Sequence, residues 1–123
     1  KIYGHMSYQK LIGDLEAYGK KNQIDFTFFQ SQGEGEIISM IHTLSDYDGL
    51  IINPAAYSHY SIAILDALKA MEQVKVEVHI SQVHQREEFR KNLITSAGCD
   101  ATISGMGLKG YQLAAEYIVS QQK

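Results

Sequence analysis

The chain has 123 residues, 45% of them hydrophobic, so it is long enough for one packed core and too short for two domains. Its 11 basic and 14 acidic residues give a net charge of −3 without a basic block, which argues against nucleic acid as a partner. No apolar run approaches the ~18 residues of a membrane span, no signal-peptide pattern is visible, and the single cysteine cannot form an intrachain disulfide, so a cytoplasmic protein without a membrane partner is expected.

Helix-like and strand-like segments alternate along the chain. Ser7 is a candidate N-cap for a first helix that carries Leu11, Leu15 and Tyr18. Apolar spacing predicts three further helices, over residues 36–44, 58–71 and about 108–120. Short apolar segments predict four buried strands, over residues 26–30, 50–53, 74–81 and 101–104.

This alternation predicts an α/β fold with an open parallel sheet and helices on both faces. Parallel neighbours require crossover connections, and those crossovers cover the sheet. The chain enters its first helix without a strand before it, whereas sheets of flavodoxin type place their first strand centrally. We therefore expect residues 1–123 to form a single α/β domain from which an N-terminal strand is missing.

The segment VKVEVHIS at residues 74–81 alternates strictly between apolar and polar side chains. In a strand, Glu77, His79 and Ser81 would share one face with Lys75. One interpretation is an edge strand whose polar face is wet. The other is a functional site, because a sheet covered on both sides has no wet face and ligands bind beyond the carboxyl ends of parallel strands.

A second predicted strand also ends in polar residues, in the stretch NPAAYSH at residues 53–59. Carboxyl ends of parallel strands meet at one edge, so Asn53 and His59 are expected to lie near Glu77 and His79. Together the four residues indicate a functional site.

Other kinds of site are less well supported by the sequence. His59, His79, His84 and Glu77 are residue types that bind zinc, but no compact H-x-x-x-H or C-x-x-C spacing is present, and we expect neither metal nor cofactor. No G-x-S-x-G elbow follows a strand, and the GEGE stretch at 33–36 lacks the lysine of a phosphate loop.

Four segments together resemble the type II 3-dehydroquinate dehydratases, a shikimate-pathway family of flavodoxin-like fold and dodecameric assembly. They are residues 28–42, 51–68, 76–92 and 101–114, and the combination of N-P-x-x-x-S-H, E-V-H-I-S and R-E-E-F-R is the most specific part. The family begins with a strand and a mobile lid bearing an essential arginine, followed by a Tyr-Gly pair, which here is Tyr3-Gly4. The resemblance implies that the chain starts just after that arginine, without the first strand and the lid.

The resemblance also implies the reaction, a dehydration of 3-dehydroquinate to 3-dehydroshikimate by anti elimination through an enolate, without Schiff base or metal. It makes Tyr3 the base at C2 and His79 the acid that protonates the departing C1 hydroxyl, with Glu77 orienting His79. Residues implied to bind the substrate are Asn53, His59, Asp66, Ile80, Ser81 and Arg90.

Asp66 matches an aspartate that reaches a neighbouring subunit's site, so the resemblance implies a homo-oligomer of trimers that assemble into a dodecamer. His59 and Asp66 both fall in the helix predicted over 58–71, so we expect them on nearly the same side, about two turns apart.

The sequence departs from the family at three positions: Ala55 replaces a usual glycine, Tyr60 replaces a common threonine, and Leu93 replaces a frequent serine. A phenol acts as a base near neutral pH only when a cation stabilises the phenolate. Arg86 and Arg90 are both candidates for that cation. The alternative function is a non-catalytic, flavodoxin-like module that binds a small anion. Aromatic amino acid biosynthesis and quinate breakdown are equally compatible with the sequence.

Overall fold

The computed structural model describes residues 5–82, 87–88 and 92–122. The chain divides into two compact units, residues 1–30 and 31–123, which are taken separately.

The described part of the first unit, residues 5–30, contains one helix, α1 (His5–Asn22). The helix begins at His5, so Ser7 lies inside it and the prediction that Ser7 is the N-cap was wrong. At the other end, Gln23 adopts a φ of 60° and the Ile24 amide donates to the Gly19 carbonyl at 2.8 Å. This left-handed residue with its backward hydrogen bond is a common way to end a helix, and it turns the chain sharply.

The predicted strand at residues 26–30 is absent, because the described sheet has three strands and none of them includes this segment. A segment becomes a strand only where a neighbour supplies backbone hydrogen-bond partners, which apolar content alone does not guarantee. Phe26 and Phe28 instead stack on each other, with ring centroids 5.9 Å apart.

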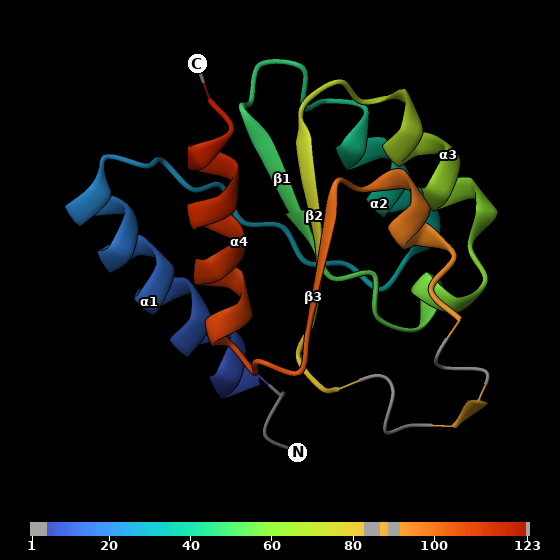
Figure 1. Cartoon of the computed structure of the whole chain (residues 1–123), viewed down its shortest axis with the longest axis horizontal. Coiled ribbons are helices and arrows are strands. Elements are labelled where there is room, and N and C mark those ends of the chain that lie inside the picture. The colour runs from blue at the N-terminus through green and yellow to red at the C-terminus, as the bar shows by residue number, and fades with distance from the viewer. Residues whose placement is uncertain (1–4, 83–86, 89–91, 123) are drawn as a thin grey trace. The chain divides into compact units, whose positions relative to one another are not determined.

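The second unit is an α/β sandwich built on a parallel sheet in the order β1-β2-β3. In Figure 1, α4 covers one face of the sheet, while α2 and α3 cover the other. The predicted parallel sheet with helices on both faces is therefore confirmed. The elements in chain order are α2 (Glu34–Ile41), β1 (Gly49–Ile52), the 3-10 helix η1 (Ala55–His59), α3 (Ile62–Ala70), β2 (Val74–His79), the 3-10 helix η4 (Thr95–Gly98), β3 (Ala101–Ser104) and α4 (Lys109–Ser120).

β2 is the central strand, and all its residues after Val74 are buried. Val76 and Val78 join Ala114 and Ile118 in an apolar cluster on the α4 side. Because strand side chains alternate, Lys75, Glu77 and His79 point to the opposite side, where α3 lies. The interpretation of β2 as an edge strand with a wet face was therefore wrong.

A second apolar cluster lies on that opposite side and positions the surroundings of Glu77. Its members come from α2, β1 and α3: Ile41, Ile52, Ile64, Ala67 and Leu68. Near its margin the buried Lys75 amine donates to the carbonyls of Met71 at 2.8 Å and Gln73 at 3.1 Å, just after α3. These bonds satisfy an ammonium group that would be costly to bury alone.

The helix predicted over residues 58–71 is divided into η1 and α3. Tyr60 has a φ of −153°, outside helical values, and the Ser61 hydroxyl then caps α3 by accepting from the Ile64 amide at 3.0 Å. His59 and Asp66 consequently belong to different elements. The prediction that they share one helix face was wrong, because the Ser61 cap starts a new helix after His59.

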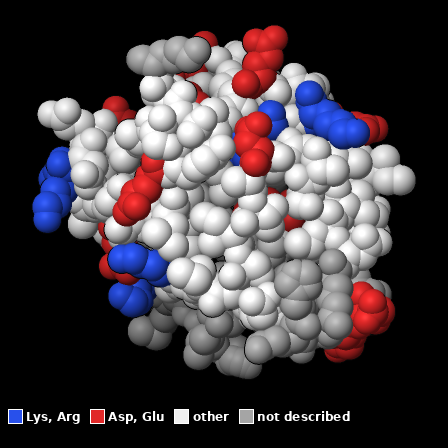
Figure 2. Space-filling view, in the orientation of Figure 1, with Lys and Arg blue, Asp and Glu red and all other residues white. Residues whose placement is uncertain are grey.

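Charged side chains are distributed over the face of the described residues that Figure 2 draws. Lys and Arg side chains are there scattered among Asp and Glu, and neither sign forms a broad patch. None of the helices in the described ranges has the length and apolar character needed to span a bilayer.

Candidate active site

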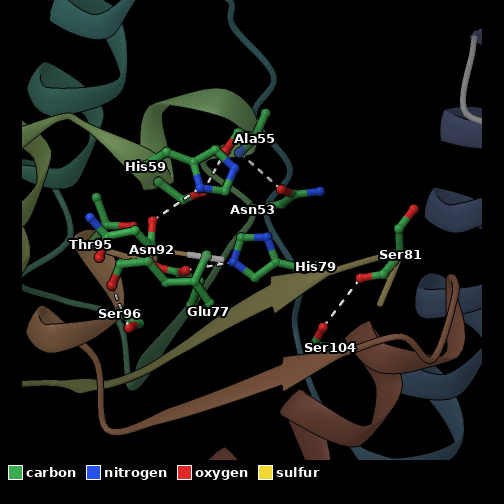
Figure 3. Close-up of polar contacts among 12 residues, drawn as sticks. Asn53, Ala55, His59, Glu77, His79, Ser81, Asn92, Thr95, Ser96 and Ser104 are labelled. Carbon is green, nitrogen blue, oxygen red and sulfur yellow. Dashed lines mark hydrogen bonds and ion pairs between the residues drawn. The ribbon is translucent and has the colours of Figure 1, made fainter. Parts of the chain in front are cut away.

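Glu77 and His79, two residues apart on the same face of β2, form a buried acid–base pair. His79 Nε2 lies 2.6 Å from Glu77 Oε2, and the Glu77 side chain is fully buried while His79 retains a small exposed edge (Figure 3). An ionised carboxylate only accepts hydrogen bonds, so with Glu77 ionised the proton of this contact belongs to Nε2. The pair thus leaves Nδ1 as the ring nitrogen that can exchange a proton with a bound molecule.

The second carboxylate oxygen of Glu77 is also occupied. Thr95, at the start of η4, donates its hydroxyl to Glu77 Oε1 at 2.6 Å and is fully buried (Figure 3). Sequence reasoning missed Thr95, because threonine is common in loops and no local pattern connects it with Glu77, 18 residues earlier.

Asn53 follows β1 directly, and the register of Ile52 opposite Glu77 brings it to the carboxyl end of β2. Its side-chain oxygen accepts from the Ala55 amide at 3.0 Å, and its side-chain nitrogen donates to the Tyr111 hydroxyl at 3.1 Å. Both ends of the amide are therefore held in place. Tyr111 was also missed, since its contact with Asn53 arises only when α4 packs on the sheet.

Ala55 has a φ of +54°, in the left-handed region. Glycine adopts that region without steric penalty, which accounts for glycine being usual at this position in the family that the sequence resembles. The side-chain oxygen of Asn53 stabilises the turn by accepting a hydrogen bond from the backbone amide of Ala55.

His59 reaches the same edge from η1. Its Nδ1 lies 3.1 Å from the Asn92 carbonyl, which fixes the half-buried ring and, when Nδ1 carries the proton, leaves Nε2 for other partners. The Ile94 amide donates to the Ser58 carbonyl at 2.7 Å and ties the two 3-10 helices together. Figure 3 shows the rings of His59 and His79 and the amide of Asn53 around one space beyond the strand ends. The structure thus brings together the four residues expected there.

The remaining predicted site residues are placed differently. Ile80 and Ser81 follow β2 and are held by the end of β3, where Ser104 Oγ donates to the Ser81 carbonyl at 3.2 Å. Asp66 is exposed on α3 and makes no hydrogen bond or ion pair with the four clustered residues in the described chain. Outside the described residues lie Tyr3, Arg90, Arg86 and His84.

The half-buried thiol of Cys99 is sensitive to the charge of Glu77. Burial raises the pKa of Cys99, just after η4, from 9.0 to about 12, and the negative charge of Glu77 contributes to the same shift. The described residues contain no group of three or more His, Cys, Asp or Glu side chains arranged to hold a metal ion.

The family model described as dehydroquinase class II matches residues 1–119. The chain belongs to the class II dehydroquinase family. This confirms the family that the sequence motifs indicated.

Relatives of this class II dehydroquinase carry a consistent name. The chain is 52% identical to a 3-dehydroquinate dehydratase of Thermotoga petrophila over 117 residues, covering 95% of this chain and 81% of that protein. It is likewise 52% identical to a 3-dehydroquinate dehydratase of Lachnoclostridium phytofermentans over 121 residues, or 97% and 83% of the two chains.

A solved structure agrees with this assignment. The crystal structure of a type II dehydroquinase from Butyrivibrio crossotus matches with a TM-score of 0.89 at 43% identity, covering 91% of this chain and 79% of that one. The flavodoxin-like fold expected from the resemblance is thereby confirmed.

Proposed function

We propose that this class II dehydroquinase is a hydro-lyase that converts 3-dehydroquinate to 3-dehydroshikimate by anti elimination through an enolate. The observation that carries the proposal is the buried Glu77–His79 pair at the carboxyl edge of a parallel sheet, where ligands of such sheets bind. Relatives with 52% sequence identity to this chain are named 3-dehydroquinate dehydratase.

His79 is assigned the role of the acid. When the C1–O bond of the enolate breaks, the departing hydroxyl takes a proton from Nδ1 of the imidazolium and leaves as water. Glu77 holds the ring through Nε2, and its negative charge stabilises the imidazolium before the transfer. The small exposed edge of His79 is the part of the ring that a substrate can reach.

Removal of the C2 proton requires a base, and Tyr3 is assigned this role from the family motif. A phenol needs a nearby cation to act as a base near neutral pH. Arg90 is assigned to substrate binding on the same ground. Both assignments rest on the motifs and not on geometry, because Tyr3 and Arg90 lie outside the described residues.

Asn53 is assigned to the water or oxyanion of the enolate. One hydrogen of its side-chain nitrogen is directed to Tyr111, and its oxygen is occupied by the Ala55 amide. The second hydrogen on the nitrogen is therefore its remaining donor for a ligand. A fixed donor of this kind suits an oxygen on which negative charge develops.

The remaining contacts to substrate come from two segments. Ile80 and Ser81 offer backbone and hydroxyl groups to the carboxylate, and His59 binds a substrate hydroxyl through Nε2. The held positions of residues 79–81 support this, since the Gly105 amide donates to the His79 carbonyl at 3.1 Å and the Gly107 amide to the Ile80 carbonyl at 3.0 Å.

We assign Asp66 to the site of a neighbouring subunit, within a homo-oligomer of trimers that form a dodecamer. Its exposure on α3 supports this role, as do the nearby apolar side chains of Tyr60 and Ile62, exposed by 60% and 64%. Large exposed apolar side chains close together are typical of protein interfaces. The enzyme would act in the cytoplasm, in the shikimate pathway or in quinate breakdown, which share this reaction.

The test is an assay of 3-dehydroquinate turnover by the ultraviolet absorbance of the conjugated product. His79→Ala should lower kcat by about 10²–10⁴-fold, the usual contribution of a positioned acid. His42→Ala is the control, since His42 is an exposed residue at the end of α2. Binding of 3-dehydroquinate without turnover would instead favour the anion-binding module. Irreversible, substrate-dependent inactivation by borohydride would overturn the enolate route in favour of an imine.

A further inference from the structure

The Glu77 carboxylate has no access to solvent, and both of its oxygens have a partner. Oε2 accepts from His79 and Oε1 accepts from Thr95, each at 2.6 Å. A buried carboxylate without hydrogen bonds is strongly unfavourable, so the Thr95 hydroxyl replaces the water that an exposed carboxylate would bind.

Thr95 can hold the carboxylate because η4 itself is firmly placed. The Ile94 amide bonds to Ser58 in η1, and Gly98 packs closely against α3. A Cβ added to Gly98 would lie 2.9 Å from Leu68 Cβ, which shows how little space separates the two elements. The backbone that carries Thr95 is therefore held against η1 and α3 by contacts that involve neither Glu77 nor His79.

The direction of the two bonds determines the proton positions. Thr95 donates to Oε1, which keeps the plane of the carboxylate oriented so that Oε2 faces His79. As long as Oε2 accepts, His79 carries a proton on Nε2, and Nδ1 is the nitrogen left for the substrate. Loss of the Thr95 hydroxyl would leave Oε1 buried without a partner and free the carboxylate to rotate away from His79.

We propose that Thr95 is a positioning residue for the acid, acting through Glu77 to keep the His79 proton on Nε2. The inference rests on the proposed function, in which His79 is the acid. It adds a third member, from an element beyond the E-V-H-I-S motif, to the Glu77–His79 pair.

The test compares variants that differ in the hydroxyl and in the methyl group of residue 95. Thr95→Val keeps the shape and removes the hydroxyl, whereas Thr95→Ser keeps the hydroxyl and removes the methyl. Thr43→Val is the matched control, because the Thr43 hydroxyl bonds to the Met40 carbonyl at an exposed helix end. Steady-state kinetics, thermal unfolding and 15N NMR of the histidine rings are measured on the whole protein.

We expect Thr95→Val to lower kcat about 10- to 100-fold, the usual cost of removing a group that orients a catalytic side chain, with KM changed by less than about threefold. Thr95→Ser should stay within about threefold of the parent kcat. In the NMR spectrum, recorded at a pH high enough for the His79 ring to be neutral, the parent and Thr95→Ser should show His79 protonated on Nε2, whereas Thr95→Val should show a mixture of the two neutral tautomers.

Equal kcat losses in Thr95→Ser and Thr95→Val would overturn the proposal, since they would point to packing of the methyl group. An unchanged tautomer in Thr95→Val would overturn it as well. If Thr95→Val does not fold, Thr95→Ser and Thr95→Ala form a second pair that differs only in the hydroxyl. The NMR measurement needs no substrate. It therefore still tests the role of Thr95 if turnover assays of the parent and of His79→Ala show that the proposed reaction is wrong.

Discussion

The side-chain amide of Asn53, directly after β1, donates a 3.1 Å hydrogen bond to the hydroxyl of Tyr111, 58 residues later in α4. Together with the bond from Ala55, this contact determines which way the amide faces. Tyr111→Phe should lower kcat/KM by about 2- to 10-fold, the size expected for one neutral hydrogen bond. Tyr117→Phe is the control, because Tyr117 lies on the exposed side of the same helix. Equal effects of the two changes would contradict a role for the Asn53 contact.

Glu77→Gln should reduce kcat less than His79→Ala does, by roughly 10- to 100-fold against the 10²–10⁴-fold of a lost acid. A glutamine has one acceptor oxygen, whereas Thr95 and His79 both donate to the two oxygens of Glu77. One donor must then face the amide nitrogen. Turnover assays of the two variants side by side give the comparison, and a Glu77→Gln enzyme with full activity would show that the carboxylate does not orient His79.

Ala55→Gly should stabilise the protein by about 0.5–1 kcal/mol, because the φ of +54° is unfavourable for alanine and free for glycine. Ala56→Gly is the matched control in the same 3-10 helix, where φ is not positive and glycine should destabilise. Urea unfolding midpoints measure both. A lower midpoint for Ala55→Gly would contradict the prediction and show that the positive φ costs alanine less than the added flexibility of glycine in the unfolded chain.

Cys99 should react slowly with iodoacetamide at pH 8 in the folded protein and rapidly after unfolding, because burial raises the pKa of its thiol to about 12. Since Glu77 contributes to the shift, Glu77→Gln should increase the folded-state rate. Mass spectrometry measures the rate of alkylation. Fast alkylation of the folded parent would contradict a raised pKa of the Cys99 thiol.

The same pKa shift makes a prediction about stability. Below pH ~9 both states hold the thiol proton, and between about 9 and 12 only the unfolded state releases it. Stability should therefore fall as pH rises through this window, and more steeply in the parent than in Cys99→Ala. Urea titrations at pH 8 and pH 10 for both proteins provide the comparison. Identical slopes would show that the thiol ionises equally in the two states.

The sequence alone predicts those parts of the structure that depend on local spacing. The alternation through Glu77 and His79 correctly placed both side chains on one face, because the period of a strand is a property of the backbone. The polar ends of two strands then indicated the site, since parallel topology brings such ends to one edge.

Features that depend on pairing or packing were not predictable in the same way. Residues 26–30 have a strand-like composition, but a strand also needs a neighbour. Ser58 and Ser61 are equally good N-cap residues by type, and only the course of the chain through Tyr60 decides between them. Thr95 and Tyr111 reach the site through tertiary contacts that leave no local pattern.

A central strand of a parallel sheet is ordinarily apolar on both faces, and β2 is not. Lys75, Glu77 and His79 occupy positions where valine or leucine would pack without desolvating a charge. Replacing the buried pair by well-packed apolar residues is expected to raise thermal stability while abolishing turnover. The polar residues that β2 needs for the reaction therefore keep the melting temperature of this enzyme below the value that an apolar central strand would give.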